Sequence, residues 1–331
     1  MGMSWELMIT KGMSTALVLL FFAAIIFLLR FLYGPKGRFR DPEWDRWNEE
    51  ARIELEKKLD AKEDQRLRDK FEQYAESFFS GDEAHDRHLR LKIDHTFRVC
   101  EHAEELIAGE PDLSDPEISR ALKLAALLHD VARFEQYTRY HTFADDLSRN
   151  HGAWGAKIIR QQNFLKNSPA PLQRLVLQAV ALHNRFAVPD ALSGKARQVL
   201  LGLRDADKLD ILRIMEDHLK PGTHGDSVIL LHLKDEPGSY SPPVLEALRQ
   251  GRGALYKDMR FHNDFRILLC TWLFDLHFGS SLGIVKRAGH MDRVIDGLDA
   301  LPDVQSEARE IAGRILSRVQ THQEAGAGFD R

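Results

Sequence analysis

Histidine and aspartate side chains recur on the apolar faces of separate predicted helices, and their types suit metal binding. The clearest case is LLHDVARFEQY, in which His129 and Asp130 follow a run of apolar residues. Burying several imidazoles and carboxylates is costly unless they are paired or bound to metal, and together they form the usual ligand set of divalent transition metals. The candidate ligands are His95, His129, Asp130, His151, His183 and Asp207. This set predicts a metal centre.

The adjacent pair His129 and Asp130 is suited to two ions. Neighbouring residues on a helix point about 100° apart, so His129 can bind one ion while Asp130, with two carboxylate oxygens, bridges to a second. A lone histidine on an apolar face is more often a hydrogen-bonded core residue. The recurrence of the pattern on several helices favours metal over that alternative.

The elements that must position these residues are helices. Apolar residues recur at helical intervals, Pro or Gly lies at several borders, and no stretch shows sustained strand alternation. The predicted helices are Leu89–Ile107, Pro116–Arg133, Asn150–Leu165, Pro171–Asn184, Lys195–Leu219, Pro243–Gln250, Asp258–Phe278 and Val304–Thr321, with Gly222–Pro242 as a loop. The sequence therefore predicts an all-α globular domain over residues 81–331.

The N-terminal residues 1–40 differ in character from the rest. Residues 13–33 read MSTALVLLFFAAIIFLLRFLY, about the length of a membrane-spanning helix. No small-residue cleavage site follows, which disfavours a signal peptide. Basic residues are denser after this run than before it, which predicts a cytoplasmic C-terminal part. We expect a single-pass membrane protein with its catalytic domain in the cytoplasm.

Residues 41–80 are rich in both charges and carry apolar residues at helical spacing. This pattern predicts an amphipathic helical stalk. Two interpretations stay open: the stalk pairs with a second copy of the chain, giving a homo-oligomer, or it packs on the globular domain.

Composition excludes several classes of protein. The chain has 331 residues, 46 basic and 50 acidic, and a formal net charge of −4, so no nucleic-acid polymer is expected as a partner. Its two cysteines, Cys100 and Cys270, lie in apolar helical surroundings and predict no disulfide. No P-loop, no nucleophile elbow and no dinucleotide fingerprint occurs.

The ordered set His, His-Asp, His, His, Asp resembles the HD-domain metal-dependent phosphohydrolase superfamily over roughly residues 85–220. The resemblance implies an HD-type helical bundle with two divalent ions, without distinguishing Mn, Fe, Mg, Zn and Ni. It implies that His95, His129, Asp130 and Asp207 bind the first metal, that His151 and His183 serve the second, and that Asp130 bridges. Asp205 competes with Asp207, but Ala-Asp-Lys-Leu resembles the closing motif of the family.

Basic residues near the predicted ligands are candidates for phosphate recognition. Arg133 lies one turn after Asp130, Lys92 and Arg98 flank His95 at three residues on either side, and Lys208 follows Asp207. We assign catalytic roles to Asp130, Arg133, Lys92 and Lys208. The segment 134–141 is expected to be a polar, aromatic loop, in which Arg139 and Tyr140, with Arg133 and Arg98, bind substrate.

These residues favour a membrane-anchored phosphohydrolase, a phosphomonoesterase or phosphodiesterase that acts on a small phosphorylated metabolite or nucleotide through a metal-activated water. The same ligand pattern also occurs in HD-type di-iron oxygenases that cleave C–C or C–P bonds, resembling myo-inositol oxygenase. A ligand-binding sensor without turnover is the third interpretation. The identity of the substrate is not encoded in these motifs.

Overall fold

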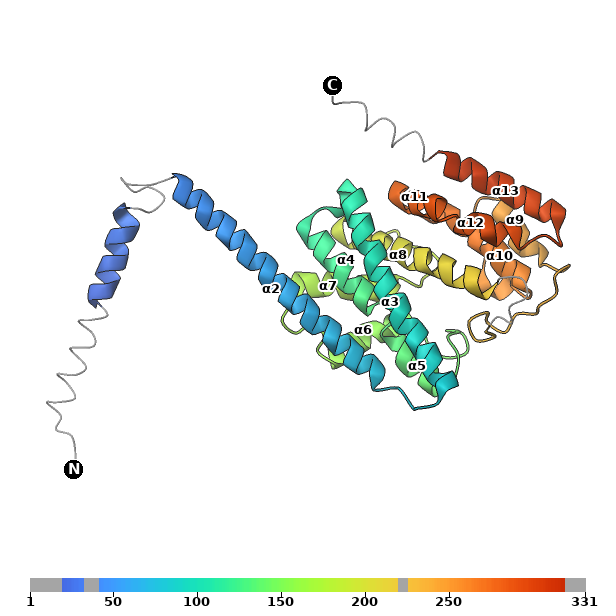
Figure 1. Cartoon of the computed structure of the whole chain (residues 1–331), viewed down its shortest axis with the longest axis horizontal. Helices are drawn as coiled ribbons and strands as arrows, with labels where there is room; N and C mark the ends of the chain where they lie inside the picture. The colour runs from blue at the N-terminus through green and yellow to red at the C-terminus, as the bar shows by residue number, and fades with distance from the viewer. Residues whose placement is uncertain (1–19, 33–41, 220–225, 319–331) are drawn as a thin grey trace, which may run out of the picture. The chain divides into compact units, whose positions relative to one another are not determined.

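The computed structural model describes residues 20–32, 42–219 and 226–318 (Figure 1). The chain divides into two compact units, Met1–Arg66 and Leu67–Arg331. The boundary falls within one long helix, so each unit is described by itself.

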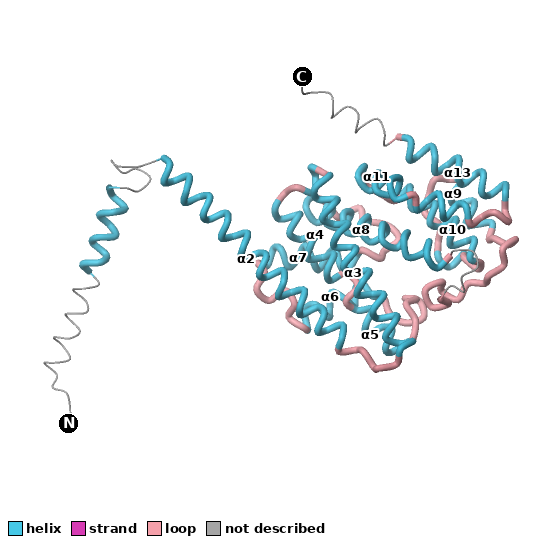
Figure 2. Tube along the Cα trace, viewed as in Figure 1, coloured by secondary structure: helices cyan, strands magenta, loops and turns pink. Residues whose placement is uncertain are grey.

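Helices joined by turns and loops make up the described residues, which contain no strand apart from one isolated bridge between Lys234 and Phe261 (Figure 2). The α-helices are α2 (Pro42–Glu76), α3 (Glu83–Gly109), α4 (Pro116–Leu128), α5 (Ala132–Tyr140), α6 (His151–Gln161), α7 (Ala170–Leu182), α8 (Gly194–His218), α9 (Pro242–Arg249), α10 (His262–Thr271), α11 (Gly279–Ala288), α12 (His290–Asp296) and α13 (Pro302–Ser317). Short 3₁₀ turns are η1 (Pro111–Leu113), η2 (Tyr256–Asp258) and η3 (Trp272–Phe274). The predicted all-α fold is confirmed for this part of the chain.

Helix α8 is the central element of the second unit. It packs against α3, α4 and α7 and contacts α11 and α12 as well. Figure 1 shows α9 to α13 gathered toward one end of α8. The apolar core follows this arrangement, since Leu122 of α4 and Leu200, Leu203 and Leu212 of α8 have no exposed surface. One helix therefore connects the first bundle with the C-terminal helices.

Polar residues at the helix starts explain where several of these helices begin. The side chain of Asp82 accepts a hydrogen bond from the backbone of His85, and Asp115 does the same for Glu117 and Ile118. Asn150 caps α6 through Ala153 N. Each cap satisfies backbone N–H groups that have no partner inside the helix.

The HD segment differs from its predicted structure. Helix α4 ends at Leu128, a turn holds His129 and Asp130, and α5 runs from Ala132 to Tyr140. The predicted loop over residues 134–141 is therefore wrong. Phe134 and Tyr137, three residues apart, are buried with Gln136 and give this short helix an inward face.

The outcome differs for two further predicted segments. The predicted helix Asp258–Phe278 is shorter, since α10 covers His262–Thr271 and η3 follows it. The predicted loop Gly222–Pro242 is confirmed for residues 226–241, which contain turns and the bridge residue Lys234 but no helix, and α9 begins at Pro242. Residues 222–225 lie outside the described part of the chain.

In the predicted helical stalk, residues 42–76 form the single helix α2. In the first unit Trp47, Leu55 and Leu59 are exposed. In the second unit Leu67, Phe71 and Ala75 are buried at four-residue intervals. The Phe71 ring meets those of Phe97 and Phe134, with centroids 6.0 and 5.6 Å away. The end of α2 thus packs into the helical core.

The predicted membrane span over residues 13–33 is contradicted. Residues 20–32 form a helix, and residues 13–19 and 33 lie outside the described residues. Nowhere in the described ranges is a helix both long and apolar enough to cross a membrane. The predicted single-pass anchor, and the membrane localisation derived from it, are therefore corrected.

The close contact between α4 and α8 generates a stability prediction. A Cβ at Gly202 would lie 2.7 Å from Leu122 Cδ2, and Leu122 is fully buried. We expect Gly202→Ala to lower the free energy of unfolding by about 1–2 kcal/mol, because overpacking outweighs the better helix propensity of alanine. Chemical denaturation of the full chain measures this change.

The matched control is Gly313→Ala in α13, where a Cβ would meet nothing within 4 Å. This variant should gain about 0.5–1 kcal/mol from helix propensity alone. Equal stability changes in the two variants would show that α4 and α8 do not meet tightly at Gly202.

Candidate metal centre

Five helices and one turn bring the six predicted ligands together. His95 lies within α3 and Asp207 within α8, whereas His151 is the first residue of α6. His129 and His183 occupy the same local position, directly after the last residue of α4 and α7. Asp130 follows in the turn before α5. All six except Asp207 are at least 95 % buried.

The ligand atoms fall into two groups. His95, His129 and Asp207 form the first group, and Asp130, His151 and His183 form the second. Within each group one ligand atom from every residue lies within 4.8 Å of the others. Three nitrogen or oxygen donors around one point suit a transition-metal ion that keeps further positions open.

Asp130 faces both groups. Its Oδ2 lies 3.6 Å from the Nε2 atoms of both His95 and His129. Its Oδ1 lies 3.4 Å from His151 Nε2 and 3.9 Å from His183 Nε2. Because each carboxylate oxygen is directed to a different histidine pair, this side chain is positioned to join two metal sites.

All four imidazoles present Nε2 to the centre, because their Nδ1 atoms are engaged elsewhere. The Nδ1 partners are Asp210 Oδ2 at 2.7 Å for His95, Ala126 O at 2.8 Å for His129, Asp145 at 2.8 Å for His151 and Val180 O at 2.8 Å for His183. Each partner is an oxygen acceptor, so Nδ1 carries the hydrogen. In a neutral ring, Nε2 then carries a lone pair that is available to a metal ion.

The spacing of these lone pairs fits bound cations. His95 Nε2 and His129 Nε2 are 3.3 Å apart, and His151 Nε2 and His183 Nε2 are 3.0 Å apart. Two lone pairs at that separation repel each other unless a cation or a proton lies between them. The orientation fixed by Nδ1 thus makes each histidine pair a ready metal ligand.

The protonation states of these side chains also favour metal binding. Burial lowers the pKa of His151 and of His183 to about 4, so both rings are neutral near pH 7. Burial alone would raise the pKa of Asp130, but Lys92, His129 and Arg133 hold it well below the usual value. Neutral imidazoles and an ionised carboxylate are the forms that bind metal.

His95 is the exception among the imidazoles. Burial and Lys92 lower its pKa, but hydrogen bonds with Asp207 and Asp210 outweigh them, and its pKa is raised. The carboxylate of Asp210 is itself fixed by Arg98 Nε and Arg213 Nε, each at 2.8 Å. His95 is therefore the imidazole whose protonated form the neighbouring carboxylates favour.

Two of the predicted cations contact the centre. Lys92 Nζ lies 2.7 Å from Asp130 Oδ2, and Arg133 Nε lies 3.3 Å from Asp130 Oδ1. Arg133 also donates to Phe143 O at 2.5 Å and to Gln136 Oε1 at 2.8 Å. Lys92 and Arg133 both lie over the Phe143 ring, at 5.3 and 5.8 Å from its centroid. Both cations are thus held beside the shared carboxylate.

The other predicted site residues lie elsewhere. Arg98 binds Asp210, behind His95. Lys208 pairs with Asp275 at 2.8 Å, and Arg139 pairs with Glu135 and lies near Trp154.

Two further residues considered in the sequence analysis, Tyr140 and Asp205, also lie away from the centre. Tyr140, at the end of α5, is exposed. Asp205 accepts from His277 N, Phe278 N and Ser281 Oγ, so it faces away from the centre, whereas Asp207 Oδ1 lies 3.2 Å from His95 Nε2.

Sequence reasoning missed the two carboxylates that orient the histidines. Asp210 lies three residues after Asp207, on the same face of α8, and this spacing was a usable signal. Asp145 lies in the segment between α5 and α6, six residues before His151. It also accepts from Asn184 Nδ2 at 2.8 Å and Gln136 Nε2 at 3.0 Å. No local pattern marked it out.

Comparison with known families matches residues 93–217 to the family described as HD domain. This segment contains all six candidate ligands and is an HD domain, as the motifs predicted. No curated protein and no solved structure matches the chain significantly. The two-metal arrangement stays a prediction of the geometry.

The contact between Asp145 and His151 generates a metal-binding prediction. We expect Asp145→Asn to weaken binding of the second metal by about 10–100-fold, because the carboxylate that fixes the His151 ring is lost. Equilibrium dialysis of the full chain against Mn²⁺, followed by metal quantification, measures this.

Asp146→Asn is the matched control, since Asp146 is the exposed neighbour of Asp145. It should leave both metals in place. Full metal occupancy in Asp145→Asn at limiting Mn²⁺ would mean that His151 does not depend on Asp145.

Proposed function

Because residues 93–217 form an HD domain, we propose that this protein is a metal-dependent phosphohydrolase. Its substrate would be a small phosphorylated metabolite or nucleotide, cleaved as a phosphomonoester or phosphodiester. The observation that carries the proposal is Asp130, whose two oxygens face two histidine pairs while Lys92 and Arg133 contact the same carboxylate.

The charge of the centre supports an anionic substrate. Asp130 and Asp207 carry two negative charges, and Lys92 and Arg133 beside them carry two positive ones. Further out, Asp210 is bound by both Arg98 and Arg213, and Asp145 lies 3.4 Å from Arg133 Nη1. With neutral imidazoles, divalent ions would leave a strong excess of positive charge, and a phosphate group neutralises such an excess well.

Divalent ions held by the two groups would lower the pKa of a bound water and polarise the phosphate oxygens. Side chains of the protein hold the metal ligands and the substrate phosphate in position. Asp145 and Asp210 hold His151 and His95 in the tautomer that presents Nε2. Lys92 and Arg133 are placed to bind non-bridging phosphate oxygens, since both are partly buried beside the centre and each has N–H groups beyond those that contact Asp130.

Metal-dependent hydrolysis tests the proposal directly. The full chain, loaded with Mn²⁺ without oxygen, should release inorganic phosphate or a phosphomonoester from members of a panel of nucleotides, sugar phosphates and phosphodiesters. We expect His129→Ala to lose metal and to lower kcat/KM by more than about 100-fold, because a ligand of the first group is gone.

The matched control is His102→Gln, two turns further along α3 from His95 and outside both ligand groups. It should keep metal and activity. Oxygen uptake by iron-loaded protein, with no phosphate released under any condition, would overturn the proposal in favour of an oxygenase. Metal binding without turnover of any compound would instead indicate a sensor.

Lys92 provides a second test, because it touches the bridging carboxylate without belonging to either ligand group. We expect Lys92→Gln to keep its metal content and to lower kcat/KM for a phosphate ester by about 10–100-fold, since a partly buried cation near the phosphate is lost. Arg90→Gln is the control on the same helix, where Arg90 is exposed and pairs with Glu83. Equal activity of both variants would remove Lys92 from substrate binding.

A further inference from the structure

A cavity of about 240 Å³ lies between α8, α10 and α12, away from the metal centre. Its lining residues are Glu216, Leu219, Arg266, Arg293, Val294, Asp296 and Gly297. None of them belongs to the ligand groups. Glu216 is nine residues beyond Asp207 on α8, about 14 Å along the helix axis at 1.5 Å per residue.

Arg266 is the unusual member of this lining. Only 9 % of its surface is exposed. Its guanidinium donates to Leu219 O at 2.5 Å and to Asn263 Oδ1 at 3.1 Å, two acceptors with partial charge only. Burial lowers its pKa, and the acidic groups that oppose this, Asp235 and Asp299, act at a distance. A buried arginine normally has a carboxylate partner, because an uncompensated charge is costly away from water.

No carboxylate among the described residues forms an ion pair with Arg266. Residues 220–225, the adjoining segment outside the described part, read Lys-Pro-Gly-Thr-His-Gly and contain no acid. The acids in the cavity wall already have partners. Glu216 pairs with Arg293 Nε at 2.5 Å and with His290 Nδ1 at 2.6 Å, and Asp296 pairs with Arg309 at 2.6 Å.

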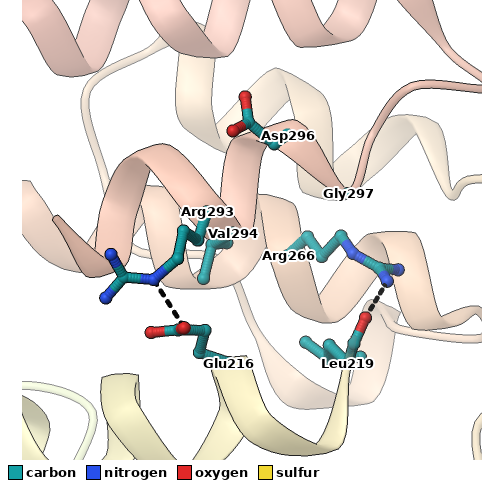
Figure 3. Close-up of a pocket in the computed structure, with 7 residues that line it drawn as sticks. All are labelled: Glu216, Leu219, Arg266, Arg293, Val294, Asp296 and Gly297. Carbon is teal, nitrogen blue, oxygen red and sulfur yellow. Dashed lines mark hydrogen bonds and ion pairs between the residues drawn. The ribbon is translucent and has the colours of Figure 1, made fainter. Parts of the chain in front are cut away.

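The arrangement of the lining suits a ligand with one charged end. Figure 3 shows Arg293 and Arg266 both directed toward α8, where they meet Glu216 and Leu219, with Val294 between them. Leu219 and Val294 supply the apolar side chains of the lining, with Leu219 near the Arg266 guanidinium and Val294 beside Arg293. An anion bound there would place its charge at Arg266 and its apolar part against these two side chains.

Gly297 matters to this arrangement because it lacks a side chain, and not because of its backbone conformation. Its φ of −70° is open to any residue. A Cβ at this position would collide with Arg266 Nε and lie 3.1 Å from Arg266 Cζ. The absence of a side chain at residue 297 therefore allows the guanidinium to lie flat against the end of α12.

We propose that this cavity binds a small organic monoanion, a carboxylate with a short apolar tail. The carboxylate takes the free N–H groups of Arg266, and the tail lies against Leu219 and Val294. A single negative charge matches the single cation without an ion pair, whereas a dianion would add an unmatched negative charge beside Glu216. The site is independent of the metal centre and of its reaction.

Butyrate is a suitable probe because it joins one carboxylate to a short apolar chain. The full chain is first freed of metal with a chelator, so that binding at the metal centre does not contribute. Calorimetric titration at constant ionic strength should then show saturable binding of one butyrate per chain. Butylammonium and 1-butanol, of the same length, should not bind.

Three variants assign this binding to the cavity. Arg266→Gln should weaken butyrate binding by at least about tenfold, whereas Arg249→Gln, at a surface pair with Glu307, should not change it. Glu216→Gln should tighten binding, because it removes a negative charge from the wall. Circular dichroism and thermal unfolding establish that each variant is folded.

Glu216→Gln keeps the test decisive if Arg266→Gln fails to fold. Unchanged or weaker butyrate binding in Glu216→Gln would overturn the proposal. So would the absence of saturable binding to the unaltered chain, or equal binding by butyrate and 1-butanol. Loss of binding in folded Arg266→Gln, together with tighter binding in Glu216→Gln, would support it.

Discussion

The hydrogen bonds at Nδ1 of four buried imidazoles determine what the centre of this protein can do. Two of the acceptors are backbone carbonyls near the ends of α4 and α7, and two are the carboxylates Asp145 and Asp210. A ring held at Nδ1 cannot turn, so its Nε2 stays directed at the centre. Helix ends have unsatisfied carbonyls in any case, and here those carbonyls orient His129 and His183.

The carboxylate of Asp130 extends this constraint from two separate histidine pairs to one centre. It lies in the turn where α4 stops, and the turn points both of its oxygens inward. His129 and Val131 keep right-handed helical backbone angles, so Asp130 points away from His129 much as it would on a continuous helix. Residues 129–131 are buried, and the buried face of α5 follows them directly.

Much of this arrangement could be read from the sequence, and the failures have physical causes. The ligands were visible because each lies within an apolar helix or directly beside the end of one. The helix α5 was missed because its polar residues include Gln136, which is fully buried and bonded to Arg133, Asp145 and Ser148. Burial of a polar side chain depends on partners distant in sequence, which periodicity does not report. The same limit hid Asp145, whereas Asp210 had a helical spacing that could have been used.

Helix α8 links the HD domain, residues 93–217, to residues 275–281 through hydrogen bonds and ion pairs. The family match ends at residue 217, yet Asp205, which has no exposed surface, finds its donors at residues 277–281. Arg204 and Lys208 both pair with Asp275. Excising residues 93–217 would leave these buried charges unmatched, at a cost of several kcal/mol, comparable to the whole stability of a typical domain. The segment that matches the family is thus shorter than the segment that must fold together. A graft of this centre onto another scaffold would have to include residues 275–281.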